Sequence, residues 1–367
     1  MNGRIGERLR YGRERAGLTL QQVCERTKIG ISSLSEYESG KRQPRLAQLR
    51  ALAGALHRSI AFFLEPGPLP SEIVLWRGKP AAQQAQELEG RFRRLCEQYH
   101  NLEVWCGERR AMNLLFQNGD PQKYCYDQAE TLAYKVLQQL QLGSRPALAL
   151  LSVLEENCGV KVFHLDFEPT GSAACTVSET LGAGVLLNAR SVRWRRNFDL
   201  AHELFHLLTW AIFQPARSGD VYDQGKDEKF ATCFARHLLM PRDAVKQAIG
   251  DIRQERALTY DDLFDLARQF DVSIEALLWQ IAFLYNRTEE QTRNDIAHCQ
   301  ALFNVSREPD RPPVRPARFE ALAVKALRSG ELSLGRFAEY MGISRREAGS
   351  YVQQEPVNEQ EVQITSS

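Results

Sequence analysis

The sequence lacks any long uninterrupted run of hydrophobic residues, and no signal-peptide pattern stands at its start. A helix that crosses a bilayer needs about 20 mostly apolar residues, and a secretory signal needs an apolar core behind a basic start. These absences argue against a membrane protein and against export. We therefore expect a cytoplasmic protein that has no membrane partner.

The chain has almost no excess of charge, because 47 Lys and Arg residues are balanced by 46 Asp and Glu residues, for a formal net charge of +1. The protein as a whole therefore has no field that would draw it onto nucleic acid. Residues 4–50 differ, since they are rich in Arg and Lys. Attraction to phosphate groups is expected to be local to that segment.

Cysteine pairs are missing as well, because none of the eight cysteines belongs to a C-x-x-C motif. In a reducing compartment this pattern favours free thiols that are buried as small apolar residues. One alternative stays open. Cys96 and His100 share a helical face, with Cys106 and Cys125 nearby, and these residues could form a redox site or a second metal site.

The most specific pattern present is the run HELFH from His202 to His206, which has the H-E-x-x-H form typical of a helical zinc site. On an α-helix, residues four apart lie one above the other, so the imidazoles of His202 and His206 can bind the same Zn2+ ion. Glu203 can then act as the general base. The alternative is a hydrogen-bonded pair of core histidines, but a buried, uncompensated Glu203 would be costly.

A catalytic zinc site needs three protein ligands, and we expect the third from a second helix that ends before Pro241. Glu228, near the start of that helix, is the predicted ligand. Asp227, Asp223 and His237 are weaker candidates. The alternative role of Glu228 is a favourable interaction with the positive end of the helix dipole.

Together these motifs resemble the ImmA/IrrE family of bacterial and phage metallopeptidases. The resemblance rests on a basic, aromatic lead-in at residues 193–198, AHELFHL at residues 201–207, and Glu228 followed by LLMP at residues 238–241. It covers roughly residues 125–285 and implies a zinc-dependent endopeptidase.

The sequence departs from this family at two positions. Phe205 stands where the family often has Gly, and Thr232 stands where it often has Asn or Asp. If the side chain at position 232 orients a ligand histidine, Thr predicts weaker metal binding or slower turnover.

The N-terminal segment has the pattern of a helix-turn-helix unit, with a helix capped by Thr19, a turn at Gly30 and a second helix from Ile31. Residues 4–65 resemble the XRE/Cro phage-repressor family, most specifically in SEYESGKRQP at residues 35–44. The resemblance implies that the protein binds a double-stranded DNA operator, as a homodimer that spans two half-sites.

In such a unit the second helix enters the major groove. The residues expected to contact base edges are Ile31, Ser32, Ser33 and Glu36. The residues expected to contact phosphates are Gln21, Lys41, Arg42 and Arg45. Lys41 and Arg42 could instead be ordinary solvated charges.

We predict a mainly α protein with a small β-sheet, that is, an α+β fold. Its parts are an N-terminal helix-turn-helix domain, a helical connector, a zinc peptidase domain, a proline-rich linker, a helix-turn-helix-like element and a disordered tail. They are expected at residues 1–66, 67–142, 143–305, 306–316, 317–354 and 355–367. The helix-turn-helix-like element is either a second DNA reader or an element that docks on protein or packs on the chain itself.

Short strands are expected at residues 160–167, 173–177 and 184–188, because these apolar segments are bounded by Gly and Pro. A sheet beside the H-E-x-x-H helix can hold an extended peptide by backbone pairing at an edge strand. We expect residues 175–178 to provide that edge.

Two classes of function fit these patterns. The first is a transcriptional regulator whose zinc endopeptidase cleaves a partner repressor or antitoxin, or itself, in response to stress or phage. The second is a repressor or antitoxin whose peptidase-like domain is a sensor or partner-binding module without turnover. The complete set of His202, Glu203, His206 and Glu228 favours the first.

Overall fold

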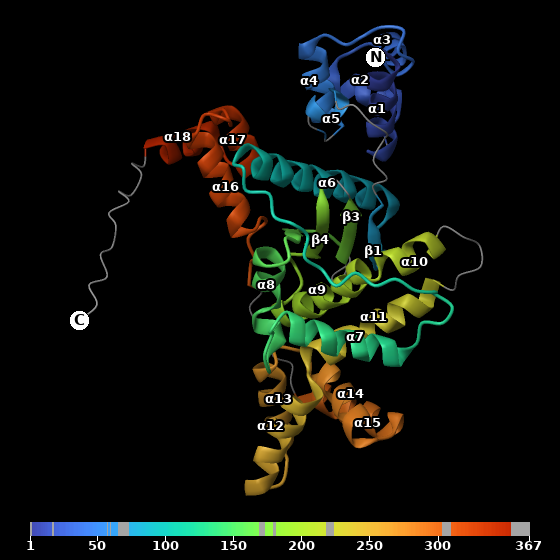
Figure 1. Ribbon diagram of the computed structural model, residues 1–367, viewed down its shortest axis with the longest axis vertical. Helices are drawn as coiled ribbons and strands as arrows, with labels where there is room; N and C mark the ends of the chain where they lie inside the picture. Colours follow the sequence, from blue (N-terminus) through green and yellow to red (C-terminus); the bar gives the residue numbers. More distant parts are fainter. Residues whose placement is uncertain are drawn as a thin grey trace.

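The protein is mainly helical and contains one four-stranded mixed sheet, which confirms the predicted α+β class (Figure 1). The predicted disordered tail, residues 355–367, lies outside the described part. No helix of the described part is long and apolar enough to cross a bilayer. The computed structural model describes residues 2–16, 18–56, 58, 60–64, 73–168, 173–178, 181–217, 224–302 and 310–353.

The N-terminal head contains five helices around a core of its own. Thr19 caps the second helix by accepting a hydrogen bond from the Gln22 amide. Val23, Leu34 and Tyr37 are buried in this core, as the helix-turn-helix pattern requires. The helices of the head are α1 (Asn2–Arg15), α2 (Leu20–Thr27), α3 (Ile31–Glu38), α4 (Leu46–Ala55) and α5 (Ile60–Leu64).

The sheet has the strand order β1-β3-β4-β2. Its strands are β1 (Leu75–Arg77), β2 (Lys161–Leu165), β3 (Ala173–Ser178) and β4 (Gly182–Asn188). β3 pairs antiparallel with both β1 and β4, whereas β2 runs parallel to β4.

The two faces of the sheet belong to different cores, because side chains along a strand point alternately to opposite faces. Val185 on β4 packs towards helix α9 (Arg193–Leu208), and Leu186 packs towards helix α6 (Ala82–Trp105). Gly184 permits the close approach of α6, since a Cβ atom there would lie 3.0 Å from the Cys96 sulfur.

The segment expected to be a helical connector also supplies β1. Leu75 pairs with Cys175 and Arg77 with Ala173, and the Thr176 hydroxyl donates to the Ile73 carbonyl at 2.7 Å. β1 therefore lies along residues 173–175, so of the edge expected at residues 175–178 its register includes only Cys175. This corrects the expectation at Cys175, because the chain's own segment after the head pairs there, and it leaves residues 176–178 as a prediction.

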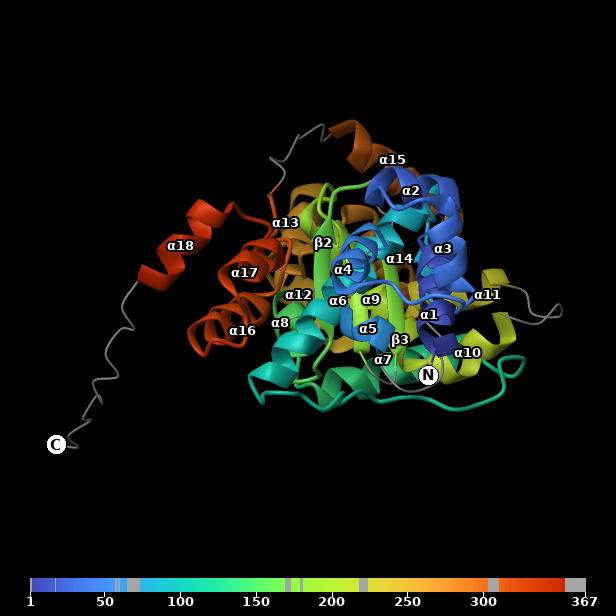
Figure 2. The same ribbon diagram turned by 90° about the horizontal axis from the view of Figure 1, so that it is seen from above.

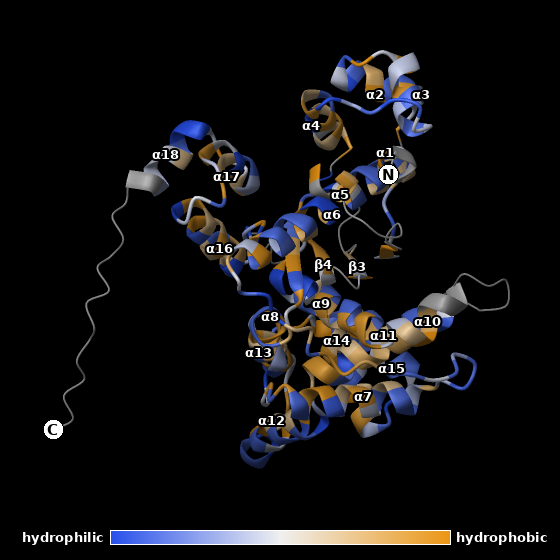
Figure 3. Ribbon diagram, turned by 45° about the horizontal axis from the view of Figure 1, so that its top comes forward, coloured by the Kyte–Doolittle hydropathy of each residue, from blue (hydrophilic) through white to orange (hydrophobic). Residues whose placement is uncertain are grey.

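Helices cover α9 on the side away from the sheet. The nearest is α11, which packs on both α9 and α7. Figure 3 shows hydrophobic residues along α9 and α14, in the interior of this layer. The remaining elements of the layer are α7 (Tyr126–Gln139), the 3-10 turn Pro146–Leu148, α8 (Leu150–Glu156), α10 (Trp210–Arg217), α11 (Gln224–Leu239), α12 (Arg242–Glu255), α13 (Tyr260–Gln269), α14 (Ile274–Tyr285) and α15 (Glu289–Leu302).

Residues 310–316, which we call the proline strap, run along the outer edge of β2. The His164 amide donates to the Val314 carbonyl at 3.1 Å, and the His164 Nδ1 atom lies 3.0 Å from the Pro313 carbonyl oxygen. Asp310 at the start of the strap pairs with Arg196 at 2.6 Å. These contacts hold the proline strap against β2, and the last three helices of the described part follow it in the chain.

The C-terminal bundle packs on α6 (Figures 1 and 2) and consists of α16 (Ala317–Arg328), α17 (Leu334–Met341) and α18 (Arg345–Gln353). The ring of Phe319 lies 5.5 Å from that of Tyr99 on α6 and 6.4 Å from that of Phe163 on β2. Gly342 takes a positive φ of 66° in the turn between α17 and α18, which suits a residue without a side chain. The expected helix-turn-helix-like geometry thus belongs to a unit that packs on the sheet layer.

Candidate metal centre and DNA-binding surface

Helix α9 places the two histidines and the glutamate of the H-E-x-x-H motif in the interior. His202, Glu203 and His206 have relative exposures of 1%, 0% and 3%. Their helix is buried because α11 covers one side of it and the sheet covers the other. Glu228, in the first half of α11, is more open, with 34% of its side chain exposed.

The structure brings His202, His206 and Glu228 together. The His202 Nε2 atom lies 3.0 Å from a Glu228 carboxylate oxygen and 3.2 Å from the His206 Nε2 atom. The His206 Nε2 atom lies 3.6 Å from the other oxygen of Glu228. Among the residues that the structure describes, this is the one group of at least three His, Cys, Asp or Glu with metal-ligand spacing. The alternative second metal site around Cys96 and His100 is not part of such a group.

These spacings fit zinc. A tetrahedral ion with bonds of about 2.0–2.2 Å places its ligand atoms roughly 3.3 Å apart, and the three distances of 3.0, 3.2 and 3.6 Å scatter around that value. Two imidazole nitrogens and one carboxylate are also a ligand set that zinc accepts. The residues present therefore suit the ion that the sequence predicts.

Burial sets the protonation of the site. It lowers the pKa of His202 to about 3, against a hydrogen bond with Glu228, so this imidazole is neutral and has a lone pair. Burial opposes ionisation of Glu228, but hydrogen bonds with His202 and His206 hold its pKa well below the usual range. Burial raises the pKa of Glu203 to about 7, although the His206 ring and the Cys175 thiol favour its charged form. A carboxyl group with this pKa can exchange protons near neutral pH.

The weaker candidates for a third ligand lie elsewhere or cannot be placed. The buried Asp227 carboxylate accepts the Glu228 amide at 3.1 Å, as expected in the first turn of a helix. His237 lies farther along α11, where its Nδ1 atom is 2.8 Å from the Cys233 carbonyl oxygen. Asp223 lies outside the described residues.

The two departures from the family pattern have different structural settings. Phe205 is fully buried among aromatic rings, 5.9 Å from that of Tyr124 and 5.7 Å from that of Phe234. Thr232 donates its hydroxyl to the Glu228 carbonyl within α11 at 2.9 Å. In the described residues the buried His202 Nδ1 atom has no hydrogen-bond partner. The contact that usually orients a zinc-ligand histidine is therefore not provided by Thr232.

The head displays most of its predicted DNA-contacting residues. Ile31 and Ser32, in the first turn of α3, are exposed, whereas Ser33 and Glu36 are half-buried. The exposed residues that are predicted to contact phosphate are Gln21, Lys41, Arg42 and Arg45. Glu36 lies 3.6 Å from the Arg42 guanidinium, so contact between Glu36 and a base requires this exposed ion pair to open.

Two family models match the chain. A helix-turn-helix domain model matches residues 4–61, and an IrrE N-terminal-like domain model matches residues 155–281. The chain is a fusion of a helix-turn-helix domain with an IrrE-like domain. It therefore combines a DNA-binding domain with a domain of a peptidase family.

Comparison with known proteins gave little beyond these two domains. No curated protein matched the chain. One similar solved structure is the crystal structure of Bacillus thuringiensis PlcR in complex with the peptide PapR7 and DNA. Its sequence identity to this chain is 12%, the match covers 96% of this chain and 95% of that one, and the TM-score is 0.17. The apo form of the competence regulator ComR from Streptococcus vestibularis is 14% identical, over 96% and 93%, with the same TM-score.

Sequence reasoning missed a cluster of charges beside the candidate metal centre of the IrrE-like domain. Asp199 on α9 is 1% exposed and contacts Arg77 of β1 and, at 3.1 Å, Arg195. Burial raises the pKa of Asp199 to about 6, against the effect of both arginines. A buried Asp three residues before His202 was a signal that a cation lies nearby, but Arg77 is 122 residues away in the chain.

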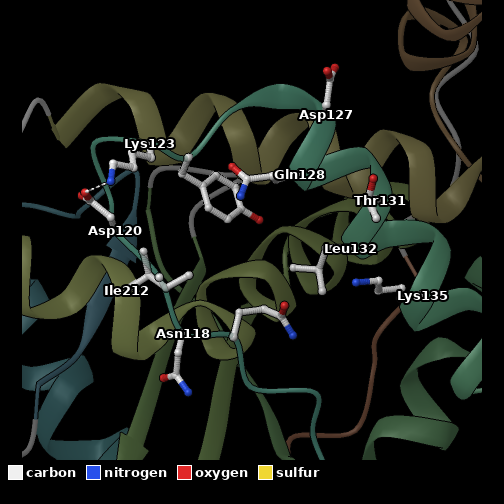
Figure 4. A pocket seen from close by; sticks show the side chains of 12 residues that line it. Asn118, Asp120, Lys123, Asp127, Gln128, Thr131, Leu132, Lys135 and Ile212 are labelled. Carbon is white, nitrogen blue, oxygen red and sulfur yellow. Dashed lines mark ion pairs between the residues drawn. The ribbon is translucent and has the colours of Figure 1, made fainter.

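A cavity of about 420 Å3 lies between α7 and the segment before it (Figure 4). Polar side chains of both signs line it, and Lys123 pairs with Asp120 at 3.8 Å. It contains no histidine or cysteine. It therefore adds no zinc ligand of those kinds to the IrrE-like domain.

Proposed function

We propose that this protein is a DNA-binding transcriptional regulator with a zinc-dependent endopeptidase that cleaves a partner repressor or antitoxin, or the chain itself, in response to stress or phage. The observation that carries the proposal is the arrangement of His202, His206 and Glu228 at tetrahedral zinc spacing, directly beside the buried Glu203.

In this proposal the two imidazoles and the Glu228 carboxylate hold the ion, and the exposed side of Glu228 marks where a substrate enters. Zinc bound there supplies Lewis-acid chemistry towards water and towards a peptide carbonyl. Glu203 takes a proton from the attacking water and passes it to the leaving amine, so that one water is added across the broken peptide bond.

The head would bind a palindromic operator as a homodimer, since a helix-turn-helix unit of this kind reads one half-site. Exposed Lys41 and Arg45 would supply phosphate contacts, and the first turn of α3 would face base edges. Replacing Lys41 with Ala should weaken binding to all DNA sequences about equally, whereas Ser33→Ala should change sequence preference. Gel-shift titrations of both full-length variants against specific and scrambled DNA would distinguish a general loss of affinity from a change in sequence preference.

The chemistry is tested with Glu203→Gln, which keeps the size of the side chain and all three metal ligands. This variant should retain stoichiometric zinc by elemental analysis and retain DNA binding, but lose cleavage of a co-expressed partner. Glu228→Ala is the matched variant that should lose the metal itself. Equal cleavage by wild type and Glu203→Gln would refute the assigned mechanism.

One observation favours the second class of function, a sensor without turnover. A zinc-ligand histidine normally donates its other ring N–H to an acceptor, and the His202 Nδ1 atom has no such partner in the described residues. In a sensor, Glu203→Gln would leave regulation unchanged, and loss of zinc in Glu228→Ala would alter it. Regulated gene expression in both variants therefore separates the two classes.

A further inference from the structure

A cavity of about 400 Å3 opens beside the metal centre, and nothing in the family match assigns it a role. Strand β1 and helices α9, α11 and α14 form its walls. We call it the arginine cavity. Its main side chains are Arg77, Arg236, Trp194, Phe198, Glu275 and Trp279.

The arginine cavity is adjacent to the proposed zinc ligands along both helices that carry them. Phe198 lies one turn before His202 on α9, and Thr232 lies one turn after Glu228 on α11, and both Phe198 and Thr232 line the cavity. One helical turn is about 5.4 Å. A peptide whose scissile bond reached the metal centre would therefore place a neighbouring side chain at this cavity.

A second opening continues the same path. Glu228 lines an adjoining cavity of about 360 Å3, and both cavities share Thr232 and Arg236 in their walls. The two cavities therefore adjoin along α11, and the second has the proposed zinc ligand in its wall. In the proposed function an extended substrate would lie along both cavities, from Glu228 to Arg236.

The charge of the arginine cavity is positive. Arg77 and Arg195 both contact the single carboxylate of Asp199 beneath them. Arg236 stacks over the Phe283 ring at 5.5 Å and hydrogen-bonds the Cys233 thiol, which leaves its charge unmatched by an ion pair among the described residues. Glu275 is the one acidic residue in the wall, so three arginines face a single lining carboxylate.

The walls of the arginine cavity also provide apolar surface for the methylene groups of a bound side chain. Trp194, Phe198 and Trp279 present apolar surface around the guanidinium groups, and the Arg77 guanidinium itself stacks over Phe198 at 5.2 Å. A side chain with methylene groups and a terminal carboxylate meets both requirements, because its stem packs on the rings and its head pairs with an arginine.

We propose that the arginine cavity is a specificity subsite that binds a glutamate side chain of the substrate, next to the bond that is cut. This assignment rests on the proposed peptidase function for the path of the substrate along the two cavities. The selection for a carboxylate rests on the residues of the cavity alone, with Arg236 as the residue that determines it.

The test measures binding without turnover. Full-length, zinc-loaded Glu203→Gln protein is titrated into fluorescently labelled, amidated peptide pools of uncharged residues in which one central position is fixed as Glu, Gln or Lys. Fluorescence anisotropy should give about tenfold tighter binding of the Glu pool than of the Gln pool, the effect expected of a charged hydrogen bond. The Lys pool should bind most weakly.

Two further variants test the role of Arg236, each made by adding one substitution to the Glu203→Gln protein. Adding Arg236→Gln should abolish the preference for Glu over Gln, and Arg236→Glu should make the Lys pool the tightest. Arg242→Gln is the matched control, because Arg242 stacks over the same Phe283 ring at 5.6 Å but does not line the cavity. It should leave the preference intact.

Equal binding of the three pools, no binding of any pool, or a Glu preference that survives Arg236→Gln would overturn the subsite. The peptidase proposal fails separately. Selection for Glu by a protein whose wild type cuts no partner would support the subsite and refute the peptidase, whereas cleavage with no charge preference would do the reverse.

Discussion

The head and the C-terminal bundle lie at opposite ends of the chain, and both contact α6, but they are attached to it in different ways (Figure 1). The head has a separate hydrophobic core and meets α6 through a buried ion pair, in which Arg58 and Glu97 are 2.8 Å apart. The bundle has no separate core. Phe319 and its neighbours pack into the same cluster as α6 and one face of the sheet.

This difference separates an attached domain from a part of the domain itself. An ion pair can open without exposing a core, whereas removal of the bundle would expose rings such as Tyr99 and Phe163. We therefore expect the head to be able to change its position while the IrrE-like domain stays folded. The bundle cannot leave without loss of that fold.

Breaking the shared core should give the largest effect. Phe319→Ala removes a fully buried ring and should lower the free energy of unfolding of the sheet-containing part by about 3–5 kcal/mol. Urea unfolding followed by circular dichroism measures this. Leu334→Ala is the control, because Leu334 is 37% exposed on the same bundle. A loss of similar size in both variants would contradict the shared core.

Breaking the ion pair should act on the head alone. Arg58→Ala leaves Glu97 charged and buried, which costs about 3 kcal/mol unless the head moves to let water reach Glu97. We expect the head to detach, seen as a larger radius of gyration by small-angle X-ray scattering, with little change in the unfolding of the IrrE-like domain. The double variant Arg58→Met with Glu97→Leu should restore the compact form. A double variant as extended as Arg58→Ala would place the attachment elsewhere.

Low pH should lower the free energy of unfolding of the part that carries the bundle before it affects the head. Burial, with a further contribution from Arg196, lowers the pKa of His164 to about 4, so His164 is neutral when it contacts the proline strap. Between pH 6.5 and 4 the unfolded chain binds a proton at this residue and the folded chain does not. Stability from this group is therefore present above pH 6.5 and is lost as pH falls towards 4, by roughly 3 kcal/mol.

His164→Gln should flatten that part of the profile of unfolding free energy against pH. DNA binding by the same samples reports on the head separately. If wild type and His164→Gln lost stability in parallel from pH 6.5 to 4, another group would be responsible.

The smallest effect is expected at the surface. Arg94 of α6 pairs with Glu339 of the bundle, whose side chain is 51% exposed. Glu339→Gln should change the free energy of unfolding by less than about 1 kcal/mol, and the change should vanish at high salt. A loss as large as that of Phe319→Ala would mean that charge, and not the shared core, holds the bundle.

The sequence predicted those features that depend on short spacings. His202 and His206 are four residues apart, so helical geometry alone brings them together. Glu228 needed one further inference, from the periodicity of a second helix. The head could be predicted because its capping residue, turn and buried positions lie within a short segment.

Features that depend on long-range pairing could not be predicted. β1 has three residues and no alternation of its own, and its partner strand lies about a hundred residues away, so Arg77 gave no sign of its place beside Asp199. The helix-turn-helix-like pattern of the bundle could be predicted, but the sequence does not state that Phe319 meets Tyr99. Such choices are decided by shape complementarity between distant segments, which no local pattern contains.

The position of β1 has a practical consequence for protein engineering. The strand at the edge of the sheet comes from the stretch that follows the head, and it carries one of the arginines of the cavity. A graft that copied only the matched region, residues 155–281, into another host would lack β1. The exposed edge of β3 would then have unpaired backbone groups and would be prone to aggregation. The smallest transferable module begins before Ile73 and extends through α18, so a designer who wants to exchange the DNA head has to cut on the N-terminal side of β1.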